Sequence, residues 1–486
     1  MLNLGLPHFR IDYHDFLRGS NSYVNYPDGG FLSQSYGINI FNTPGVLGIT
    51  AHKNETVRST LNVNEPVIAW GMGPSSTGLG AIVVGLGSNG NSDGYFYNVA
   101  DDGTITQNGS EDTTQDYNGR GFVDVVQYNS KWYFTSRSNV IQCSLDLNTK
   151  DLTYWTTTKS KSSLNNFSPH PMVVYNNILW IADQNYLHKL DGTTATTQAF
   201  DLPAGWVITA MAVYNNLIYM AAEPYWNASS TYHGQAKIYT WNGYSDSWLD
   251  EYDMDARVNA LYVFDGTLFC FTNYYLGYFD GVKVKPLRPL SSPVYKCQVT
   301  QVDGSMFYAE GTNLVRYGSP VPGTRRVFVK HVPAISSQGY SAIFSWYQKR
   351  LLLIENGASG NPGIPYLISD INDLGSGSDS YQFDFNPRFF SRQVRIRGIV
   401  VETVDGLSSG QSVDVDYIDH KGARKQGAYF GYGNSQFNLH GENIFGFDVA
   451  DGVVTRTVQP AITITNNARL RYVDFYYEPS EAPLNN

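Results

Sequence analysis

The stretch Met172-Val-Val-Tyr175-Asn-Asn177-Ile-Leu-Trp-Ile-Ala182 decides the fold. Two apolar runs flank an Asn-Asn pair, and such pairs tolerate the positive φ that a tight hairpin turn requires. The same unit, an apolar run followed by a two-residue turn and a second apolar run, returns along the chain. Its turns follow Tyr214, Phe264 and Val302, with looser copies after Tyr128 and Tyr347.

The spacing of these hairpins indicates a repeat architecture. The six turns begin near residues 128, 175, 214, 264, 302 and 347, at intervals of 47, 39, 50, 38 and 45 residues. A hairpin and two looser strands in each interval is the period of a β-propeller blade, a four-stranded sheet. A further pair, Pro66–Met72 and Ala81–Gly87, joined by a long turn over Pro74–Gly80, raises the count to seven hairpins. The sequence therefore predicts six or seven blades, and six with one irregular unit is favoured.

The segments on either side of the repeats differ from it. Residues 1–35 are rich in Gly, Asn and Pro and predict an extended N-terminal arm, before a propeller over 36–375. One of two short strands, Gly37–Phe41 or Val46–Ala51, is expected to complete the last blade and so close the ring. Long alternating strands from residue 383 predict a C-terminal β-sandwich over 383–478, followed by a frayed tail at 479–486. The predicted fold class is all-β.

Composition excludes several classes of protein. The 486 residues carry a net charge of −10 and no long basic run, which argues against a general nucleic-acid-binding surface. Charged residues in the first 16 positions leave no apolar core for a signal peptide, and no apolar stretch approaches membrane-spanning length. Three widely spaced cysteines predict buried free thiols in place of a disulfide framework: Cys143, Cys270 and Cys297.

Catalytic and cofactor motifs are weak in this chain. Gly85-Leu-Gly87-Ser-Asn-Gly90 matches a dinucleotide fingerprint, but no helix pattern follows, so it is interpreted as a glycine-rich turn. The nine histidines show no metal-ligand spacing, and neither a metal nor a cofactor is expected. Propellers that cleave glycosides need two or three carboxylates near the axis. The candidates are Asp124, Asp183, Asp253, Asp255 and Glu310.

Two loops carry the candidate binding residues. The loop over 223–235 combines aromatic side chains with a histidine, which suits sugar stacking or an interface: Tyr225, Trp226, Tyr232 and His233. The acidic loop over 100–120 is a candidate cation loop through Asp101, Asp102, Glu111 and Asp112. A loop packed on its own blade and a solvated acidic loop are the respective alternatives.

Three pieces of the chain together carry a resemblance to a known family. They are the opening Tyr26-Pro-Asp-Gly-Gly-Phe31 with Tyr36-Gly-Ile-Asn-Ile40 and Pro44-Gly-Val-Leu47, the hairpins from about 66 to 355, and the long strand from Phe390 to Thr403. In pattern the chain resembles propeller-bearing virion proteins of tailed bacteriophages, especially tail nozzle or hub proteins of short-tailed phages. Such nozzle proteins are often larger than this chain.

The resemblance implies a structural role without an active site. It implies a ring-shaped homo-oligomer in the virion tail, synthesised in the host cytoplasm, that extends the DNA-ejection channel. Portal or adaptor proteins and tail fibres would be partners, DNA would pass without specific binding, and the host surface is a candidate partner. A negatively charged wall would repel passing DNA. The alternatives are a carbohydrate-binding or carbohydrate-cleaving propeller and a cellular interaction scaffold.

Overall fold

The structure is a computed structural model of the whole chain, and it divides into two compact units. It describes residues 5–16, 20–21, 31–32, 38–43, 46–49, 56–57, 69–75, 78–86, 93–99, 105–112, 122–136, 140–145, 150–151, 154–155, 164, 169–224, 235–320, 323, 325–332, 339–346, 350–355, 365–368, 371, 380–432, 444–449, 452, 454–466 and 468–480. The first unit comprises residues 1–55, 313–334 and 369–486, and the second comprises 56–312 and 335–368.

Seven four-stranded antiparallel sheets follow one another in the described part of the chain. The first three sheets contain β7 (Ala69–Ser75), β8 (Gly78–Leu86), β9 (Asp93–Val99) and β10 (Ile105–Asp112); β11 (Phe122–Tyr128), β12 (Lys131–Ser136), β13 (Val140–Ser144) and β14 (Lys150–Asp151); and β15 (Met172–Tyr175), β16 (Ile178–Asp183), β17 (Tyr186–Asp191) and β18 (Thr194–Asp201). The next two contain β19 (Trp206–Tyr214), β20 (Leu217–Pro224), β21 (Ala236–Trp241) and β22 (Asp250–Met254); and β23 (Val258–Phe264), β24 (Thr267–Thr272), β25 (Tyr275–Phe279) and β26 (Val284–Pro289). The last two contain β27 (Val299–Val302), β28 (Ser305–Glu310), β29 (Asn313–Gly318) and β30 (Val327–Val332); and β31 (Tyr340–Trp346), β32 (Arg350–Glu355), β33 (Pro365–Ile368) and β6 (Thr56–Val57).

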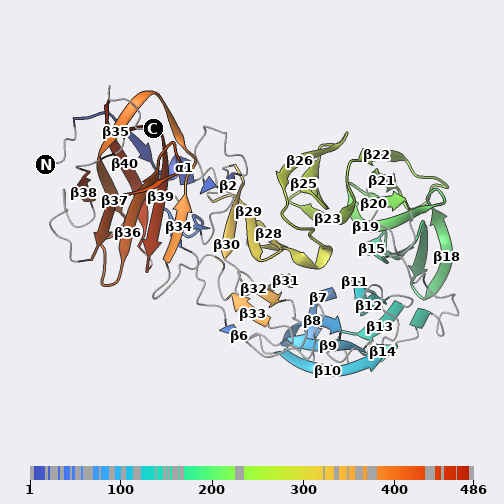
Figure 1. Cartoon of the computed structure of the whole chain (residues 1–486). Helices are drawn as coiled ribbons and strands as arrows, with labels where there is room; N and C mark the ends of the chain where they lie inside the picture. Colours follow the sequence, from blue (N-terminus) through green and yellow to red (C-terminus); the bar gives the residue numbers. More distant parts are fainter. Residues whose placement is uncertain are drawn as a thin grey trace. The chain divides into compact units, whose positions relative to one another are not determined.

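The sheets form a β-propeller. The sheets from β7 to β26 and the sheet of β31 to β33 surround a common centre, and the first strand of each is the innermost (Figure 1). The last of them is completed by β6, whose Thr56 and Val57 lie opposite Leu367 and Tyr366 of β33. An N-terminal strand therefore closes the ring, as predicted, but neither predicted strand does so. Those segments contain β4 (Ile38–Asn39) and β5 (Gly48–Ile49), which pair with each other.

The predicted hairpin turns are confirmed where the structure describes them. Both residues of five turns have positive φ: Asn129 and Ser130, Asn176 and Asn177, Asn215 and Asn216, Asp265 and Gly266, and Asp303 and Gly304. These values, between 44° and 69°, are those of the turns that match the twist of paired strands. The sixth turn, 347–349, lies outside the described residues, but Trp346 and Arg350 on either side of it are paired.

The glycine-rich segment before residue 100 is more regular than predicted. Strand β7 continues to Ser75, which pairs with Gly78, so the predicted turn over Pro74–Gly80 is too long. This part of the strand was predicted as a loop because its glycines and proline do not show the alternation of apolar and polar side chains that indicates a strand. Strand β8 ends at Leu86 and strand β9 begins at Asp93, and residues 87–92, which hold most of the predicted glycine-rich turn, lie outside the described residues.

Tyrosine hydroxyls link neighbouring sheets near the turns. Tyr128 ends β11 and donates to the carbonyl of Asn177 at 3.0 Å, and Tyr175 ends β15 and donates to the carbonyl of Asn216 at 2.6 Å. The Tyr128 oxygen also accepts the N–H of Gly192 at 2.8 Å. The last residue of one innermost strand thus binds the hairpin turn of the next sheet, which fixes the spacing of the sheets near the axis.

Removing one such link is expected to lower stability measurably. Tyr175→Phe keeps the ring, which is 8% exposed, but leaves the Asn216 carbonyl without this donor, at a cost of about 1 kcal/mol. Tryptophan fluorescence in urea measures this, because all nine tryptophans lie in the second unit. Tyr244→Phe is the matched control, since its side chain is 77% exposed, and its effect should stay within about 0.5 kcal/mol. Equal effects of the two substitutions would contradict the link.

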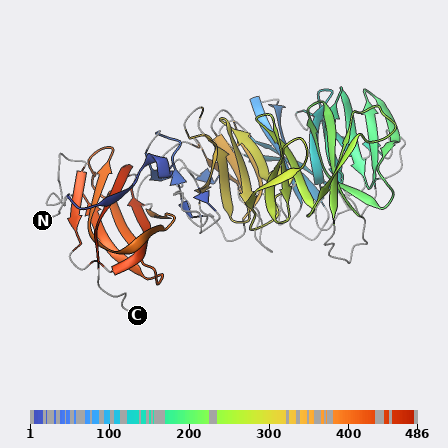
Figure 2. The same ribbon diagram turned by 90° about the horizontal axis from the view of Figure 1, so that it is seen from above.

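The first unit contains one curled sheet at the C-terminal end of the chain (Figure 2). Its order is β1-β40-β35-β39-β36-β37, with β34 on β39 and β38 on β35. Its strands are β1 (His8–Ile11), β34 (Ser380–Asp384), β35 (Arg388–Thr403), β36 (Ser412–Ile418), β37 (Arg424–Gly431), β38 (Ile444–Asp448), β39 (Val454–Thr465) and β40 (Leu470–Pro479).

This curled sheet replaces the predicted sandwich of two separate sheets. Strand β39 pairs with β35 through residues 454–458 and with β36 through 459–465, so one strand belongs to both halves. The sheet curls around a single apolar core that includes Phe383, Val415, Ile462 and Phe475. Alternation along each strand predicted one buried face correctly. It could not show that one long strand, β39, pairs with strands of both halves of the sheet, β35 and β36.

The N-terminal residues are part of this sheet and not only an extended arm. Strand β1 pairs with β40, and the Arg10 guanidinium forms two 2.8 Å bonds with the Asp474 carboxylate. The Phe9 ring stacks on that of Phe475 at 4.9 Å. The short helix α1 (Tyr13–Phe16) follows, and β2 (Ser20–Asn21) pairs in parallel with β3 (Phe31–Leu32).

The three cysteines are free thiols, as predicted. Cys143 and Cys270 are buried and Cys297 is half-buried. Burial raises the pKa of the Cys270 thiol, which keeps it protonated and unreactive.

Candidate functional site

Buried charged residues of the second unit gather at one end of its sheets. Because neighbouring strands are antiparallel, the first strand of each sheet begins where the second and fourth strands end. This side is the loop end, and the side of the two-residue turns is the turn end. Four polar groups lie at the loop end: Asp124 with Lys296, Asp183 with His188, Arg288 with Glu310, and Glu223 with Arg257.

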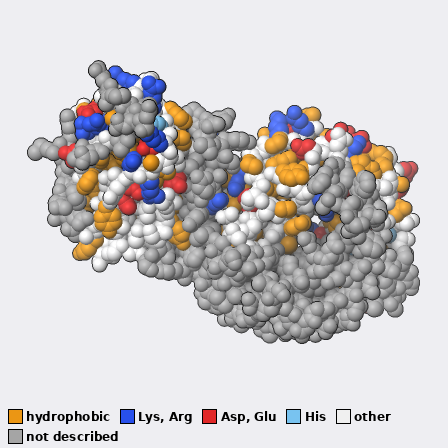
Figure 3. All heavy atoms as spheres, viewed as in Figure 1, with side chains coloured by type: hydrophobic (Ala, Val, Ile, Leu, Met, Phe, Trp, Pro, Cys, Tyr) orange, Lys and Arg blue, Asp and Glu red, His pale blue; other side chains and the backbone are white. Residues whose placement is uncertain are grey.

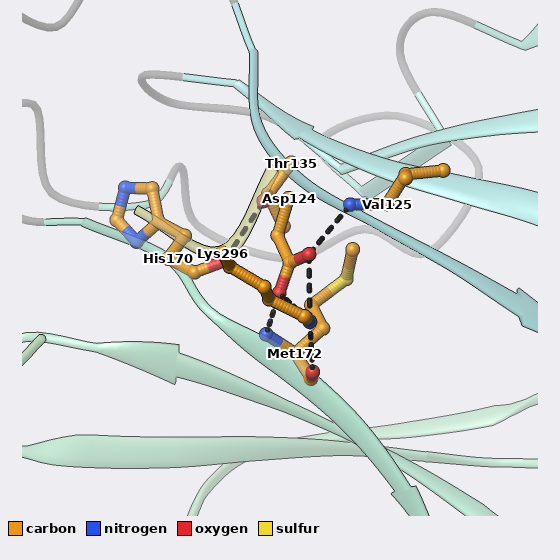
Figure 4. A network of polar contacts seen from close by, with 6 residues as sticks. All are labelled: Asp124, Val125, Thr135, His170, Met172 and Lys296. Atoms are coloured by element: carbon orange, nitrogen blue, oxygen red, sulfur yellow. Dashed lines mark hydrogen bonds and ion pairs between the residues drawn. The ribbon is translucent and has the colours of Figure 1, made fainter. Parts of the chain in front are cut away.

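The first group joins two innermost segments that are far apart in the sequence. Asp124 of β11 accepts two bonds from Lys296 Nζ, at 2.8 and 2.7 Å, and accepts the backbone N–H of Met172 at 2.8 Å (Figure 4). Lys296 opens the short 3₁₀ helix η3 (Lys296–Gln298) just before β27, 172 residues from its partner. The side chain of Asp124 is 7% exposed and that of Lys296 is 43% exposed. The Asp124 carboxylate therefore links three segments of the chain: β11, the start of β15 and η3.

The second group is an aspartate between two histidines. His188 Nδ1 accepts the N–H of Gln198 at 2.9 Å, so the ring proton lies on Nε2, which donates to Asp183 Oδ2 at 3.3 Å. His170 Nδ1 lies 3.8 Å from Asp183 Oδ1 and 3.0 Å from the carbonyl oxygen of Ala182. Figure 4 shows His170 beside the first group, where its carbonyl accepts from Thr135 at 2.8 Å. These hydrogen bonds hold the imidazole rings of His170 and His188 in fixed positions inside the protein.

The third group is the most deeply buried ion pair. Arg288 of β26 donates to Glu310 of β28 at 3.0 Å and to the Tyr308 hydroxyl at 2.8 Å. Glu310 is 3% exposed and also accepts the N–H of Ser291. Burial raises the pKa of the Tyr308 phenol, so this hydroxyl remains a neutral hydrogen-bonding partner.

The fourth group differs from the others because polar atoms in it lack partners. Arg257 Nη1 lies 3.2 Å from Glu223 Oε1, and the two side chains are 36% and 13% exposed. Glu223 Oε2 and Arg257 Nε are buried and have no hydrogen-bond partner among the described residues. Burial raises the pKa of the Glu223 carboxyl, and the Arg257 charge only partly opposes this. The pair is therefore incompletely satisfied, unlike the other three groups.

An amide pair and an exposed aromatic ring border the fourth group. Asn259 Nδ2 donates to Asn273 Oδ1 at 2.9 Å, and the Asn273 N–H donates to the Arg257 carbonyl at 3.1 Å. Asn259 is left over where the pairing of β23 and β24 shifts register, as in a β-bulge, which re-aims a side chain. Tyr274, which follows Asn273 in the sequence, is 58% exposed. Amides, a carboxylate, a guanidinium and an aromatic ring thus occur together at the loop end.

The raised pKa of Glu223 predicts a pH dependence of stability. The folded carboxyl binds its proton more tightly than the unfolded one, whose ordinary pKa is 4.5. The free energy of unfolding therefore falls as the pH rises from 4.5 through the folded pKa. Glu223→Gln removes this decrease, so the variant should gain stability relative to the wild type across that window. Urea unfolding at a series of pH values measures it, and a difference independent of pH would contradict the assignment.

The structure describes only half of the predicted cation loop. Strand β10 runs from Ile105 to Asp112, so Glu111 and Asp112 lie at its end, paired with Gly94 and Asp93. Asp101 and Asp102 lie outside the described residues. A cation shared by the four residues therefore stays a prediction.

The predicted loop over 223–235 is described only at its ends, and its candidate residues all lie outside the described residues: Tyr225, Trp226, Tyr232 and His233. Strands β20 and β21, which it connects, meet it at Pro224 and Gln235. In the described part of the chain, no group of three or more His, Cys, Asp or Glu residues could hold a metal ion. No helix among the described residues is long and apolar enough to cross a membrane.

The sequence patterns did not identify the basic partners of the candidate carboxylates, and they also did not identify the Glu223 carboxylate that pairs with Arg257. Of these carboxylates, Asp124, Asp183 and Glu310 are bonded as described above; Asp255 accepts from the Tyr275 hydroxyl, and Asp253 lies 3.5 Å from Lys237. Lys296, Arg257 and Arg288 carried no sequence signal, because each partner comes from another sheet. Only their position at the beginning or end of a predicted strand could have marked them.

Comparison with known proteins yields distant similarity only. The sequence matches no protein-family model and no curated protein. The N-terminal domain of Nup159 is similar with a TM-score of 0.38 at 8% identity, covering 69% of this chain and 96% of that one. BamB from Moraxella catarrhalis gives 0.39 at 10%, covering 69% and 95%. An exo-β-1,3-galactanase from Phanerochaete chrysosporium gives 0.32 at 9%, covering 87% and 100%. The fold assignment rests on the sheet topology.

Proposed function

We propose that this chain is a structural virion protein of a bacteriophage tail, a nozzle- or hub-type component that acts by assembly and not by catalysis. Copies of the chain would form a ring that extends the DNA-ejection channel, beside portal or adaptor proteins and tail fibres. We also infer that the seven four-stranded sheets are the seven blades of one propeller. The sequence pattern that resembles nozzle proteins supplies the virion part of this proposal.

The observation that carries the assembly role is the bonding of the candidate carboxylates. A glycosidase needs one carboxyl to protonate the leaving oxygen and a second to attack or activate water. Here Asp124 and Glu310 are nearly buried, and basic side chains and backbone N–H groups occupy their oxygens. Such carboxylates stabilise a scaffold. They are poorly placed to exchange protons with a substrate.

An open edge of the curled sheet supports contact between copies. Strand β37 ends the sheet order, and among the described residues it pairs only with β36. Tyr429 in this strand and Tyr432 just after it are 49% and 62% exposed. An unpaired edge with exposed aromatic rings can add a strand from another chain. We assign this edge to contacts with a second copy.

The charge distribution supports passage of DNA without binding. The net charge is −10, and on the face drawn in Figure 3 the described Lys and Arg side chains lie among Asp and Glu side chains. Specific or tight binding of phosphates needs a continuous basic surface. Mixed charges with an acidic excess would leave DNA free to move along such a wall.

The mass of the native particle tests this proposal. The chain is expressed alone and then mixed with portal and adaptor proteins encoded beside it, and native mass spectrometry measures the assembly. A ring, alone or after mixing, is expected, and Tyr429→Asp should return it to smaller species while Tyr244→Asp should not. A chain that stays monomeric in both conditions overturns the assembly role.

Carbohydrate binding is the second candidate, and one observation favours it. The unpaired polar atoms of Glu223 and Arg257 lie at the loop end, where the side chain of Tyr274 is exposed. Among the four polar groups, this one retains hydrogen-bonding capacity for a ligand. The observation favours binding and not cleavage, because a single carboxylate is present in the group.

A further inference from the structure

The polar group around Glu223 has the chemistry of a ligand site. A buried polar atom without a partner costs about 1–3 kcal/mol, so two in one ion pair require an explanation. Glu223 Oε2 can only accept a hydrogen bond while it is ionised, and Arg257 Nε can only donate one. A hydroxyl group both donates and accepts, so hydroxyl groups satisfy both atoms, whereas a group that only donates or only accepts satisfies one.

The charges of the group restrict the ligand class further. Glu223 would repel an anionic ligand, and Arg257, with its nitrogen 3.2 Å from the carboxylate, would repel a metal ion or another cation. The pair as a whole is neutral. A neutral ligand with several hydroxyl groups remains. The Arg257 side chain is 36% exposed, so one side of the ion pair borders solvent, and the pair would have to open for a hydroxyl group to reach the two buried atoms.

Neighbouring residues add the other contacts that a sugar ring requires. The Asn259–Asn273 pair uses one amide hydrogen and one carbonyl between its side chains. This leaves the Asn259 carbonyl and the Asn273 amide nitrogen for further bonds. The ring of Tyr274, 58% exposed and next in the chain to Asn273, offers an apolar face for the C–H groups of a pyranose.

We propose that Glu223, Arg257, Asn259, Asn273 and Tyr274 form a binding site for a neutral oligosaccharide at the loop end of the second unit. This inference rests on the carbohydrate-binding candidate function and names its site and ligand class. The ion pair and the amide pair would bond the hydroxyl groups, and Tyr274 would stack on the ring. The site binds without cleaving, and the tail-assembly proposal does not depend on it.

An oligosaccharide array followed by titration tests the site. The full chain is applied to an array of neutral and uronic-acid-containing bacterial oligosaccharides, and the strongest neutral binder is titrated by calorimetry. Tyr274→Ala and Glu223→Gln should each weaken binding about tenfold, since each removes one contact of about 1–1.5 kcal/mol. Tyr244→Ala, an equally aromatic and more exposed position at the turn end, should leave binding unchanged.

Each other outcome overturns a distinct part of the inference. Binding that survives Tyr274→Ala and Glu223→Gln would overturn the site but keep the carbohydrate-binding function. Binding of acidic oligosaccharides alone would overturn the ligand class. Failure to bind any oligosaccharide would overturn the function itself, and ordered water would then account for the unpaired atoms. Thermal unfolding of each variant, followed by tryptophan fluorescence, confirms that the second unit is folded.

Discussion

Glu310→Ala is expected to lower the free energy of unfolding of the second unit by about 3–5 kcal/mol. The reason is the environment of its partner. Arg288 is 7% exposed and always charged, and the carboxylate 3.0 Å away balances that charge inside the protein. Alanine would leave the guanidinium with the neutral Tyr308 hydroxyl at 2.8 Å and would also remove the acceptor of the Ser291 N–H. Urea unfolding followed by tryptophan fluorescence measures the loss.

A surface pair in the same unit provides the matched control. Lys237 Nζ lies 2.7 Å from Glu251 Oε1, but the two side chains are 22% and 44% exposed. Water solvates either charge once the other is removed, so Glu251→Ala should cost no more than about 1 kcal/mol. The double variant Arg288→Met, Glu310→Leu should recover most of the loss, because no unpaired charge stays buried. Similar costs for Glu310→Ala and Glu251→Ala would contradict the burial argument.

The parts of the fold that the sequence predicted are the parts set by local chemistry. Asn176, Asn177, Asp265 and Asp303 adopt positive φ because their own side chains and neighbours favour it, so turns and their period could be predicted without any distant contact. Closure by Thr56–Val57 could not be predicted, since a two-residue strand has no periodicity. The same holds for β7, where glycines conceal a strand.

The candidate site was less predictable because its interactions are long-range. The carboxylate Asp124 was singled out, but Lys296 is 172 residues away and carries no pattern that marks it as a partner. Glu223 is the first residue of the predicted loop over 223–235 and lies two residues before Tyr225, so the region was identified while this residue was not. Asn259 owes its place to a register shift between β23 and β24, which depends on how the strands pair and not on the identity of single residues.

The N-terminal strand offers a decisive test of the first unit, where an arm was predicted. Ile11 is 1% exposed, lies opposite Val473 of β40 and belongs to the core of the curled sheet. Ile11→Ala should therefore cost about 2–5 kcal/mol, as for other large-to-small core changes. Amide hydrogen exchange of residues 470–479 in urea measures this unit, which contains no tryptophan.

The expected cost follows from burial and not from the position of Ile11 near the chain end. An arm that only lies along the surface would lose less than about 0.5 kcal/mol on the same substitution. Phe389→Ala is the matched control, since this larger side chain is 62% exposed in the same sheet and should have a small effect. If Ile11→Ala matched that control, β1 would be a detachable arm, free to pair with another copy. If it is costly, β1 is a fixed strand of this sheet and is not exchanged between copies.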